Sequence, residues 1–309
     1  MESSTSSKLK RFFRFVEIET KLATMIPSLA ALAYVFYTTG TINFSSMGIY
    51  FIAALFLDMS VTAINNHLDK REDESQTPHY SKLTSLAIIG AMLLVFSALG
   101  LYLAYLHGVT VLLAGVFCLF VGVAYTFGPA PISKSAYGEL VSGFTVGSVV
   151  MFIVVSINNP DFQPLGLVFY MSELRLAMDI DLVGLAAFAL VTLPAAFSTA
   201  NIMLANNICD EERDRPFRYT IVHHLGKKRA LYLFAGLYYG VYLAVVMASI
   251  LRIVPLWCLL VLGTLPLVQR NIRSFFAEQK KNTTFLLAIK NFVIIMLAYI
   301  LGIVLGGVI

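Results

Sequence analysis

The sequence predicts an all-α membrane protein with nine transmembrane helices, and three observations lead to this fold class. The 309 residues are 58% hydrophobic and only 13% charged, and their mean hydropathy is +0.80, which is too apolar for an ordinary soluble domain. Apolar windows of about 20 residues, the length that crosses a hydrocarbon core, recur along the chain. The basic residues fall almost entirely between alternate windows. These features place the chain in a bilayer and give no support to nucleic-acid binding.

The predicted spans are residues 22–40, 46–67, 83–105, 108–127, 138–157, 182–208, 230–251, 253–270 and 288–308. Nine crossings put the two termini on opposite sides of the membrane. Because Lys and Arg concentrate in cytoplasmic loops, the loops test this count. With the N-terminus in the cytoplasm, all of the 22 basic residues except Arg175 and Arg252 fall on the cytoplasmic side. The sequence therefore favours nine spans with a cytoplasmic N-terminus.

The remaining segments do not divide the chain, so we expect a single membrane domain over residues 1–309. Residues 1–21 are polar and basic, lack an obvious small-residue cleavage site, and are expected to form a cytoplasmic N-terminal segment. Residues 158–181 are the long external connection, in which we expect a short amphipathic stretch along the outer surface. The three cysteines lie in or beside apolar runs without a partner at a plausible spacing, so no disulfide is expected.

Two polar motifs end two of the apolar runs. Residues 65–73 have the pattern Asn-Asn-x-x-Asp-x-x-x-Asp at the end of the second predicted span, and residues 206–214 repeat it at the end of the sixth. Both ends are cytoplasmic in the predicted topology, where an anionic substrate from the cytosol would arrive. Because four spans separate the two motifs, the sequence suggests two four-helix pseudo-repeats followed by a ninth helix.

The spacing of the first motif puts its polar residues on one helix face. Each residue of a helix turns by about 100°, so Asn65, Asp69 and Asp73 lie within about 80° of arc. Asp58 and Thr62, deeper in the same span, continue this stripe. Acids inside a membrane span are costly unless they face a polar cavity and have partners. The stripe therefore indicates a functional site.

The two motifs together indicate a site for a divalent metal and a diphosphate. The acids that carry it are Asp69, Asp73, Asp210 and Asp214. Their mutual repulsion is relieved by cations, and Mg²⁺ prefers carboxylate oxygens and is commonly completed by substrate phosphates. The first asparagine of each motif, Asn65 or Asn206, can add a neutral carbonyl ligand. The alternative is a pair of ordinary charge runs at helix ends, but such runs have no need of an asparagine pair one turn deeper.

The paired motifs, the nine spans and the cytoplasmic placement resemble the UbiA-type intramembrane prenyltransferases over nearly the whole chain. Residues 204–215, continuing through 219–221 to 225–230, are most similar to the branch of that family that acts on 1,4-dihydroxy-2-naphthoate in menaquinone synthesis. Residues 124–131, leading to 137–140, resemble the family's connection between the fourth and fifth spans.

The resemblance implies helices around a central cavity and an enzyme that uses Mg²⁺ to transfer a polyprenyl group from polyprenyl diphosphate to 1,4-dihydroxy-2-naphthoate, giving a demethylmenaquinone precursor. It also implies a bacterial cell membrane, with the site facing the cytoplasm. Two alternatives remain open. One is the same chemistry on 4-hydroxybenzoate, haem, a chlorin or a glycerol phosphate lipid. The other is a cation-coupled transporter, which needs acids near the bilayer centre of several helices.

The expected site residues form two groups. Catalysis is assigned to the two stripes, that is to Asp58, Asn65, Asp69, Asp73, Asn206, Asp210 and Asp214, and the four motif acids among them are the expected metal ligands. Substrate binding is assigned to Asn66, Asn207, Lys134, Tyr125, Tyr137 and Arg215. Asp58 is expected to accept a hydrogen bond or a proton from the acceptor, or alternatively to be a buried polar group satisfied by a neighbouring helix. The basic and tyrosine side chains can equally be interfacial anchors.

Overall fold

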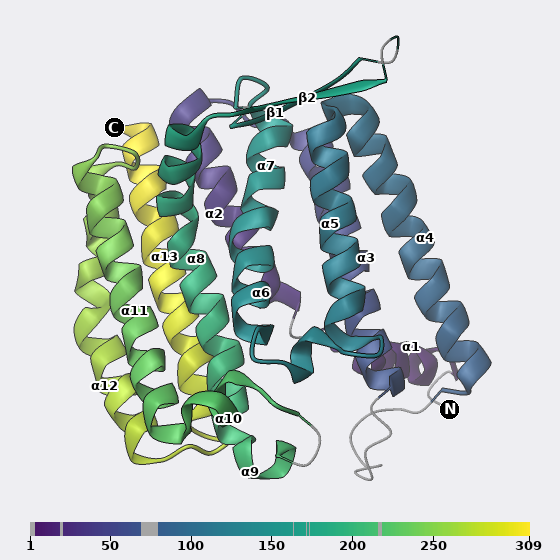
Figure 1. Ribbon diagram of the computed structural model, residues 1–309, viewed down its shortest axis with the longest axis vertical. Helices are drawn as coiled ribbons and strands as arrows, with labels where there is room; N and C mark the ends of the chain where they lie inside the picture. The colour runs from purple at the N-terminus through teal and green to yellow at the C-terminus, as the bar shows by residue number, and fades with distance from the viewer. Residues whose placement is uncertain are drawn as a thin grey trace.

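The computed structural model describes residues 4–18, 21–68, 80–162, 164–170, 172, 174–215 and 218–309. Long helices run side by side and form a bundle, with short elements at its two ends (Figure 1). The helices α1 (Ser4–Phe15), α9 (Glu211–Asp214) and α10 (Ile221–Leu225) lie at one end. A small β-hairpin and the end of α13 (Phe285–Val308) lie at the other.

Seven helices of the described part are long and apolar enough to cross a membrane, so the chain is an integral membrane protein. They are α3 (Phe44–Leu68), α4 (Lys82–His107), α5 (Val109–Thr126), the continuous segment Gly138–Asn158, α8 (Leu182–Cys209), α11 (Lys227–Ile250) and α13. Each coincides with a predicted span. The segment Gly138–Asn158 consists of α6 (Gly138–Phe144), a π-helical turn η3 (Thr145–Val149) and α7 (Val150–Asn158).

The two other predicted spans, 22–40 and 253–270, coincide with less regular elements. The first is α2 (Lys21–Thr39), whose apolar part is Met25–Thr39. The second is a 3₁₀ segment, η4 (Leu256–Thr264), followed by α12 (Leu265–Ala277). Pro255 precedes η4 and a second proline lies in the first turn of α12, and a proline cannot donate a backbone hydrogen bond. The count of nine crossings and the pseudo-repeat therefore remain predictions.

Close backbone contact holds η4 against α13. A Cβ atom placed on Gly302 of α13 would lie only 2.6 Å from the Cα atom of Cys258, so only glycine allows this approach. Small residues at helix contacts are the usual way in which membrane helices pack closely, since lipid provides little hydrophobic drive for association. The eighth predicted span is thus held to the bundle by packing although its helix is irregular.

The external connection contains a β-hairpin that the sequence analysis did not predict. Strands β1 (Leu165–Tyr170) and β2 (Arg175–Ile180) pair in antiparallel fashion, with Leu165 opposite Ile180. Val168 and the two aromatic residues after it favour extended structure, and strand pairing satisfies backbone groups next to the membrane. The sequence analysis expected only a short amphipathic stretch in this segment and did not specify its secondary structure.

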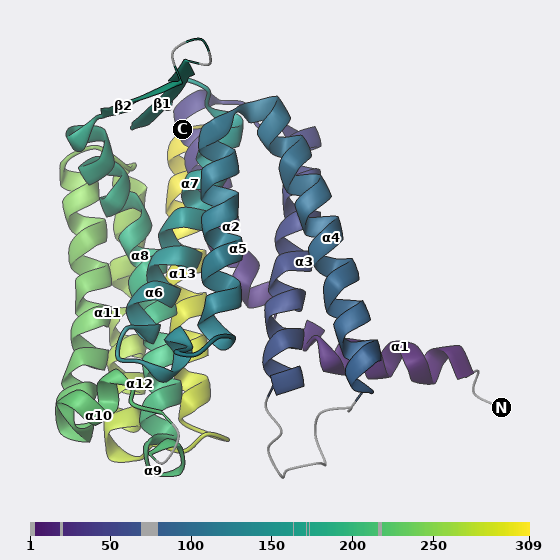
Figure 2. The ribbon, with the colours of Figure 1, turned by 45° about the vertical axis from the view of Figure 1, so that its right-hand side comes forward.

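The N-terminal segment folds as a helix that lies across the end of the bundle (Figure 2). In α1 the Phe15 side chain is buried and its ring packs against the ring of Tyr80, with centroids 5.1 Å apart. The guanidinium of Arg11 lies 4.4 Å from the centroid of the same tyrosine ring. An amphipathic, basic helix in this position is typical of segments that lie in a membrane interface.

The segment Gly138–Asn158, in the region of the fifth predicted span, packs closely against α8. A Cβ atom on Gly147, in η3, would lie 2.3 Å from the Cα and N atoms of Ala196 in α8, so the two backbones touch at this point. The start of α6 consequently lies beside the last turns of α8, where the second polar motif begins.

Candidate active site

The second motif forms a short helical ladder at the end of α8. The backbone N–H of Asp210 donates to the carbonyl of Asn206 at 3.1 Å, and the N–H of Asp214 donates to the carbonyl of Asp210 at 2.8 Å. The chain therefore continues from α8 into α9 with helical spacing, and these residues follow one another along a single face. Asp210 and Asp214 are buried, with exposed fractions of 6% and 2%.

Basic side chains surround these two buried carboxylates. Arg213 Nη2 lies 2.8 Å from Asp210 Oδ2, and Lys281 Nζ lies 2.7 Å from the same oxygen. Arg213 and Arg218 flank Asp214, each with its Nε atom 3.7 Å from a carboxylate oxygen. Buried charges are stable only when they are paired, and each of these two carboxylates has basic partners.

Lys281 reaches the motif from the distant connection between α12 and α13. Its ammonium group also donates to Asn206 Oδ1, so one cation is held between an amide oxygen and a carboxylate oxygen one helical turn apart. Oxygen donors of this kind are those that Mg²⁺ prefers. Asn206 and Asp210 can thus hold one positive charge between them, and their oxygen donors fit a metal cation.

The other half of the expected metal site cannot be compared in the same way, because Asp69 and Asp73 lie outside the described residues. Among the residues that the structure describes, no group of three or more His, Cys, Asp or Glu side chains could hold a metal ion. The described part therefore supplies the two aspartates of the second motif and their asparagine.

The first motif begins in the last turn of α3. Asn65 is half-buried there. The side-chain amide of Asn66 donates to the carbonyl of Phe15 at 3.0 Å and to Glu17 Oε1 at 3.1 Å. Asn66, expected to bind substrate, thus ties the end of α1 to the first motif in this structure.

An inner polar pair connects the fifth predicted span to the second motif. The amide of Asn207 donates to Glu139 Oε1 at 2.7 Å, and both residues are buried. The second carboxylate oxygen, Glu139 Oε2, is buried and has no hydrogen-bond partner among the residues that the structure describes. The Tyr125 hydroxyl lies beside Gly138 and within electrostatic range of Glu139 and Arg218. Sequence analysis did not select Glu139, although this acid begins an apolar run and lies within residues 137–140, which resemble the family's connection.

The remaining expected substrate-binding residues lie on the connections at this end. Lys134, in the 3₁₀ turn η2 (Ile132–Lys134), is exposed, and its carbonyl accepts a hydrogen bond from the backbone N–H of Tyr219 at 2.9 Å. Tyr137 and Arg215 are also exposed. Arg218, which the sequence analysis did not select, lies against Asp214, with its Nε atom 3.7 Å from Oδ2.

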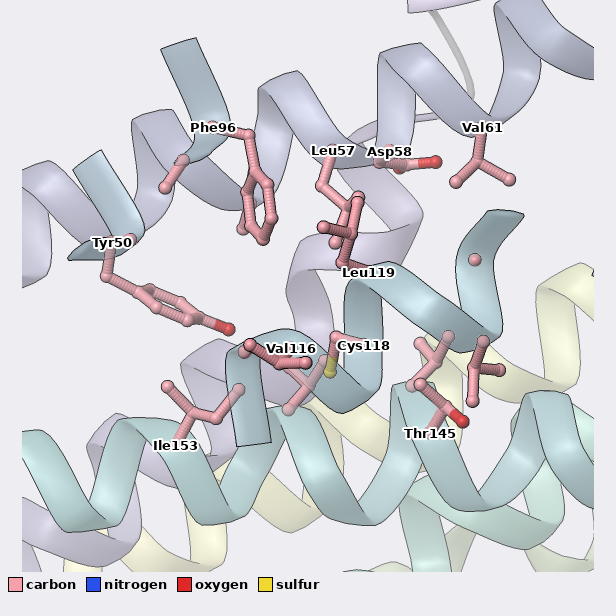
Figure 3. A pocket seen from close by; sticks show the side chains of 18 of the residues that line it. Tyr50, Leu57, Asp58, Val61, Phe96, Val116, Cys118, Leu119, Thr145 and Ile153 are labelled. Carbon is pink, nitrogen blue, oxygen red and sulfur yellow. The ribbon is translucent and has the colours of Figure 1, made fainter. Parts of the chain in front are cut away.

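A cavity of about 470 Å³ lies among α2, α3, α4, α5 and the segment Gly138–Asn158. Its walls are mostly apolar, with Leu57, Phe96 and Val116 among them. Figure 3 shows Asp58 near Val61 at one end and Tyr50 towards the other. The residues that line this cavity all precede α8 in sequence and come from the first five predicted spans, so the first expected repeat forms most of the cavity and the second contributes its first span.

The polar end of the cavity contains an ion pair between α2 and α3. Lys21 Nζ lies 3.0 Å from Asp58 Oδ1 and donates to Thr62 Oγ1 at 2.5 Å. Asp58 and Thr62 therefore share one side of α3. Lys21 is buried, with an exposed fraction of 4%, whereas Asp58 lines the cavity. Asp58 is thus compatible with both interpretations of this residue, because its carboxylate is paired with a neighbouring helix and also faces the cavity.

These features define a membrane protein with an apolar cavity in its bundle and a cluster of paired acidic and basic side chains at the end of α8. The family model described as the UbiA prenyltransferase family matches residues 24–293. The chain belongs to the UbiA prenyltransferase family, which confirms the resemblance seen in its motifs.

Individual relatives are more distant. The 1,4-dihydroxy-2-naphthoate octaprenyltransferase of Bacillus subtilis (strain 168) is 28% identical over 182 residues, which are 59% of this chain and 51% of that protein. The chain thus spans about half the length of this relative.

Solved structures share the fold. A digeranylgeranylglyceryl phosphate synthase has a TM-score of 0.64 and 18% identity, covering 98% of this chain and 99% of that one. A UbiA homologue from Archaeoglobus fulgidus, bound to GPP and Mg²⁺, has a TM-score of 0.62 and 14% identity, covering 97% of this chain and all of that one. At these identities the likeness concerns the fold.

Proposed function

We propose that this protein transfers a polyprenyl group from polyprenyl diphosphate to 1,4-dihydroxy-2-naphthoate in a Mg²⁺-dependent reaction. The observation that carries the proposal is the position of Tyr125. This residue lines the apolar cavity, and its hydroxyl lies beside Gly138, the neighbour of Glu139, whose carboxylate accepts a hydrogen bond from Asn207 of the second motif. A long apolar group and a charged diphosphate can therefore be bound side by side.

The second motif and its basic neighbours are the proposed diphosphate site. Asp210 and Asp214 would hold Mg²⁺ together with Asp69 and Asp73, and the bound metal would neutralise charge on the departing diphosphate. Arg213 and Arg218 supply guanidinium groups that suit phosphate oxygens. Their present contacts with the buried aspartates keep them at the site before substrate arrives.

The cavity is the proposed site of the polyprenyl tail. When the allylic C–O bond breaks, the diphosphate leaves with the electron pair, and an electron-rich ring carbon of the acceptor attacks the allylic cation. For the naphthoate acceptor the new C–C bond replaces the ring carboxylate, which leaves as carbon dioxide. The apolar walls around Leu57 and Phe96 exclude water, which would otherwise capture the cation.

Asp58 is the proposed acceptor-side group. It lies at the polar end of the cavity, where the buried ammonium of Lys21 is 3.0 Å from Oδ1. A carboxylate at this position can accept a hydrogen bond or the proton of a ring hydroxyl.

The choice of acceptor rests on the likeness to the Bacillus subtilis relative. The same geometry suits other acceptors, namely 4-hydroxybenzoate, haem, a chlorin or a glycerol phosphate lipid. A cation-coupled transporter is less well supported, because the buried acids Asp210 and Asp214 lie at the end of the bundle and not near the middle of several helices. We place the site on the cytoplasmic side of a bacterial cell membrane, in accordance with the distribution of basic residues.

The test is a transfer assay with purified protein in detergent, a labelled polyprenyl diphosphate and a panel of these acceptors. We expect prenylated product only with naphthoate and only when Mg²⁺ is present. The Asp210→Ala variant should lose roughly a hundredfold or more of its rate, whereas Glu212→Ala, at an exposed neighbouring position, should keep it. Transfer without a divalent metal would overturn the mechanism, and transfer only to hydroxybenzoate would overturn the acceptor.

A further inference from the structure

The connection between α12 and α13 carries two neighbouring lysines with different surroundings. Lys281 points to the second motif, with its Nζ atom 2.7 Å from Asp210 Oδ2 and a further hydrogen bond to Asn206 Oδ1. Lys280 pairs with Glu278 on the same connection at 2.5 Å, and its side chain is 65% exposed. The chain therefore provides one lysine at the motif and an adjacent lysine away from it.

Asp210 Oδ2 is contacted by two cations at once, because Arg213 Nη2 also lies 2.8 Å from it. Two positive charges on one carboxylate oxygen leave no position there for a divalent ion. A metal bound by Asn206 Oδ1 and Asp210 Oδ2 must therefore displace Lys281, which contacts both oxygens.

Lys281 is the side chain that a metal would displace, because it also contacts the other proposed ligand atom, Asn206 Oδ1. The Arg213 side chain is more exposed, at 62%, but it belongs to α9 and is also paired with Asp214. Lys281 comes from a turn between two helices, and 39% of its side chain is exposed. Its ammonium also lies 5.0 Å from the centroid of the Phe285 ring, and the face of an aromatic ring attracts a cation. A rotation of its four-carbon stem can therefore move the ammonium towards solvent without moving a helix.

We infer that Lys281 occupies a cation position of the metal site when no metal is bound, and that a divalent metal displaces it. This inference rests on the proposed function, since it takes the second motif to be metal-binding. Lys281 keeps Asn206 and Asp210 in place before metal arrives, and it weakens metal binding because the ion must compete with it. Lys281 is thus a positioning residue that sets the metal affinity of the site.

The test measures binding of Mn²⁺, which suits carboxylate ligands as Mg²⁺ does, by electron paramagnetic resonance of the purified full-length protein. We expect Lys281→Met to lower the dissociation constant for Mn²⁺ by about tenfold, equivalent to about 1.4 kcal/mol. The matched control Lys280→Met should leave it unchanged, and Lys281→Arg should keep it near the wild-type value because a cation is still present.

A second readout needs no variant at the motif. Lysine modification of the wild-type protein, followed by mass spectrometry, should show that saturating Mn²⁺ increases the labelling of Lys281 several-fold and leaves that of Lys280 constant. Mn²⁺ binding that is unaffected by Lys281→Met, or labelling of Lys281 that does not rise, would overturn the inference alone. If no variant bound Mn²⁺, the inference and the metal part of the proposed function would both be wrong.

Discussion

At the residue scale, the site depends on charged side chains that lie far apart in the sequence. Asp58 pairs with Lys21 across two helices, and Asp210 pairs with Lys281 from the last connection of the chain. The spacing within each motif could be predicted because helical periodicity is local. The partners Lys21 and Lys281 could not be assigned, because many basic residues occur at helix ends and sequence does not say which of them reaches an acid.

The partner of Glu139 also could not be assigned from the sequence. Its hydrogen bond with Asn207 joins residues 68 positions apart, and neither neighbouring residues nor spacing indicated the pair. The acid was visible in the sequence at the start of an apolar run, but only the contact between α6 and α8 shows that it faces the second motif.

The role of Asp58 is open to a direct test. We expect Asp58→Asn to lower turnover by roughly a hundredfold and to raise the KM for the acceptor, while the KM for polyprenyl diphosphate stays constant. The variant leaves the buried Lys21 ammonium opposite a neutral group, which destabilises the protein. Steady-state kinetics with each substrate varied in turn measures the effect.

A double variant separates chemistry from stability. Lys21→Met together with Asp58→Asn removes both charges and should restore the thermal unfolding midpoint close to that of the wild type, yet leave turnover low. Full turnover and an unchanged acceptor KM in the Asp58→Asn variant would show that Asp58 serves the fold alone.

At the scale of the elements, hydropathy located the seven regular spanning helices because their apolar windows are long and continuous. It located the region of η4 and α12 but not its irregular form, which depends on two prolines and on close packing against Gly302. The β-hairpin was missed because short apolar runs do not separate a strand from an amphipathic segment.

The close contact between η3 and α8 leads to a prediction about stability. Gly147→Ala should destabilise the protein by roughly 1–3 kcal/mol, because the new methyl group would lie 2.3 Å from the backbone of Ala196. It should also lower transfer activity, since α6 carries Glu139. Thermal unfolding in detergent, followed by the transfer assay, measures both effects.

The matched control is Gly236→Ala in α11, where an added Cβ atom meets nothing within 4 Å. Alanine is favoured over glycine inside a helix by about 1 kcal/mol, so this variant should be as stable as the wild type or slightly more so. Equal stability of the two variants would contradict the close contact between η3 and α8.

At the scale of the whole molecule, the two motif-bearing helix ends and the β-hairpin lie at opposite ends of the bundle (Figure 1). This arrangement predicts that the two ends of the bundle are accessible from opposite sides of the membrane. In a background with Cys118, Cys209 and Cys258 replaced by alanine, Ser172→Cys in the hairpin turn should react with a membrane-impermeant maleimide in intact cells. Glu212→Cys, beside the second motif, should react only after the cells are opened. Labelling of Glu212→Cys in intact cells would contradict the cytoplasmic site.

The sequence by itself determines that this chain lies in a membrane, where most of its helices run, which family it resembles and how each polar motif is spaced along a helix. These properties depend on composition and local periodicity, which the order of residues contains directly. Tertiary structure alone decides that the apolar cavity lies in the first half of the bundle, that Glu139 meets Asn207 and that Lys281 covers Asp210. Each of these depends on which helices pack together, and that choice follows from close contacts such as Gly147 against Ala196, between residues distant in sequence.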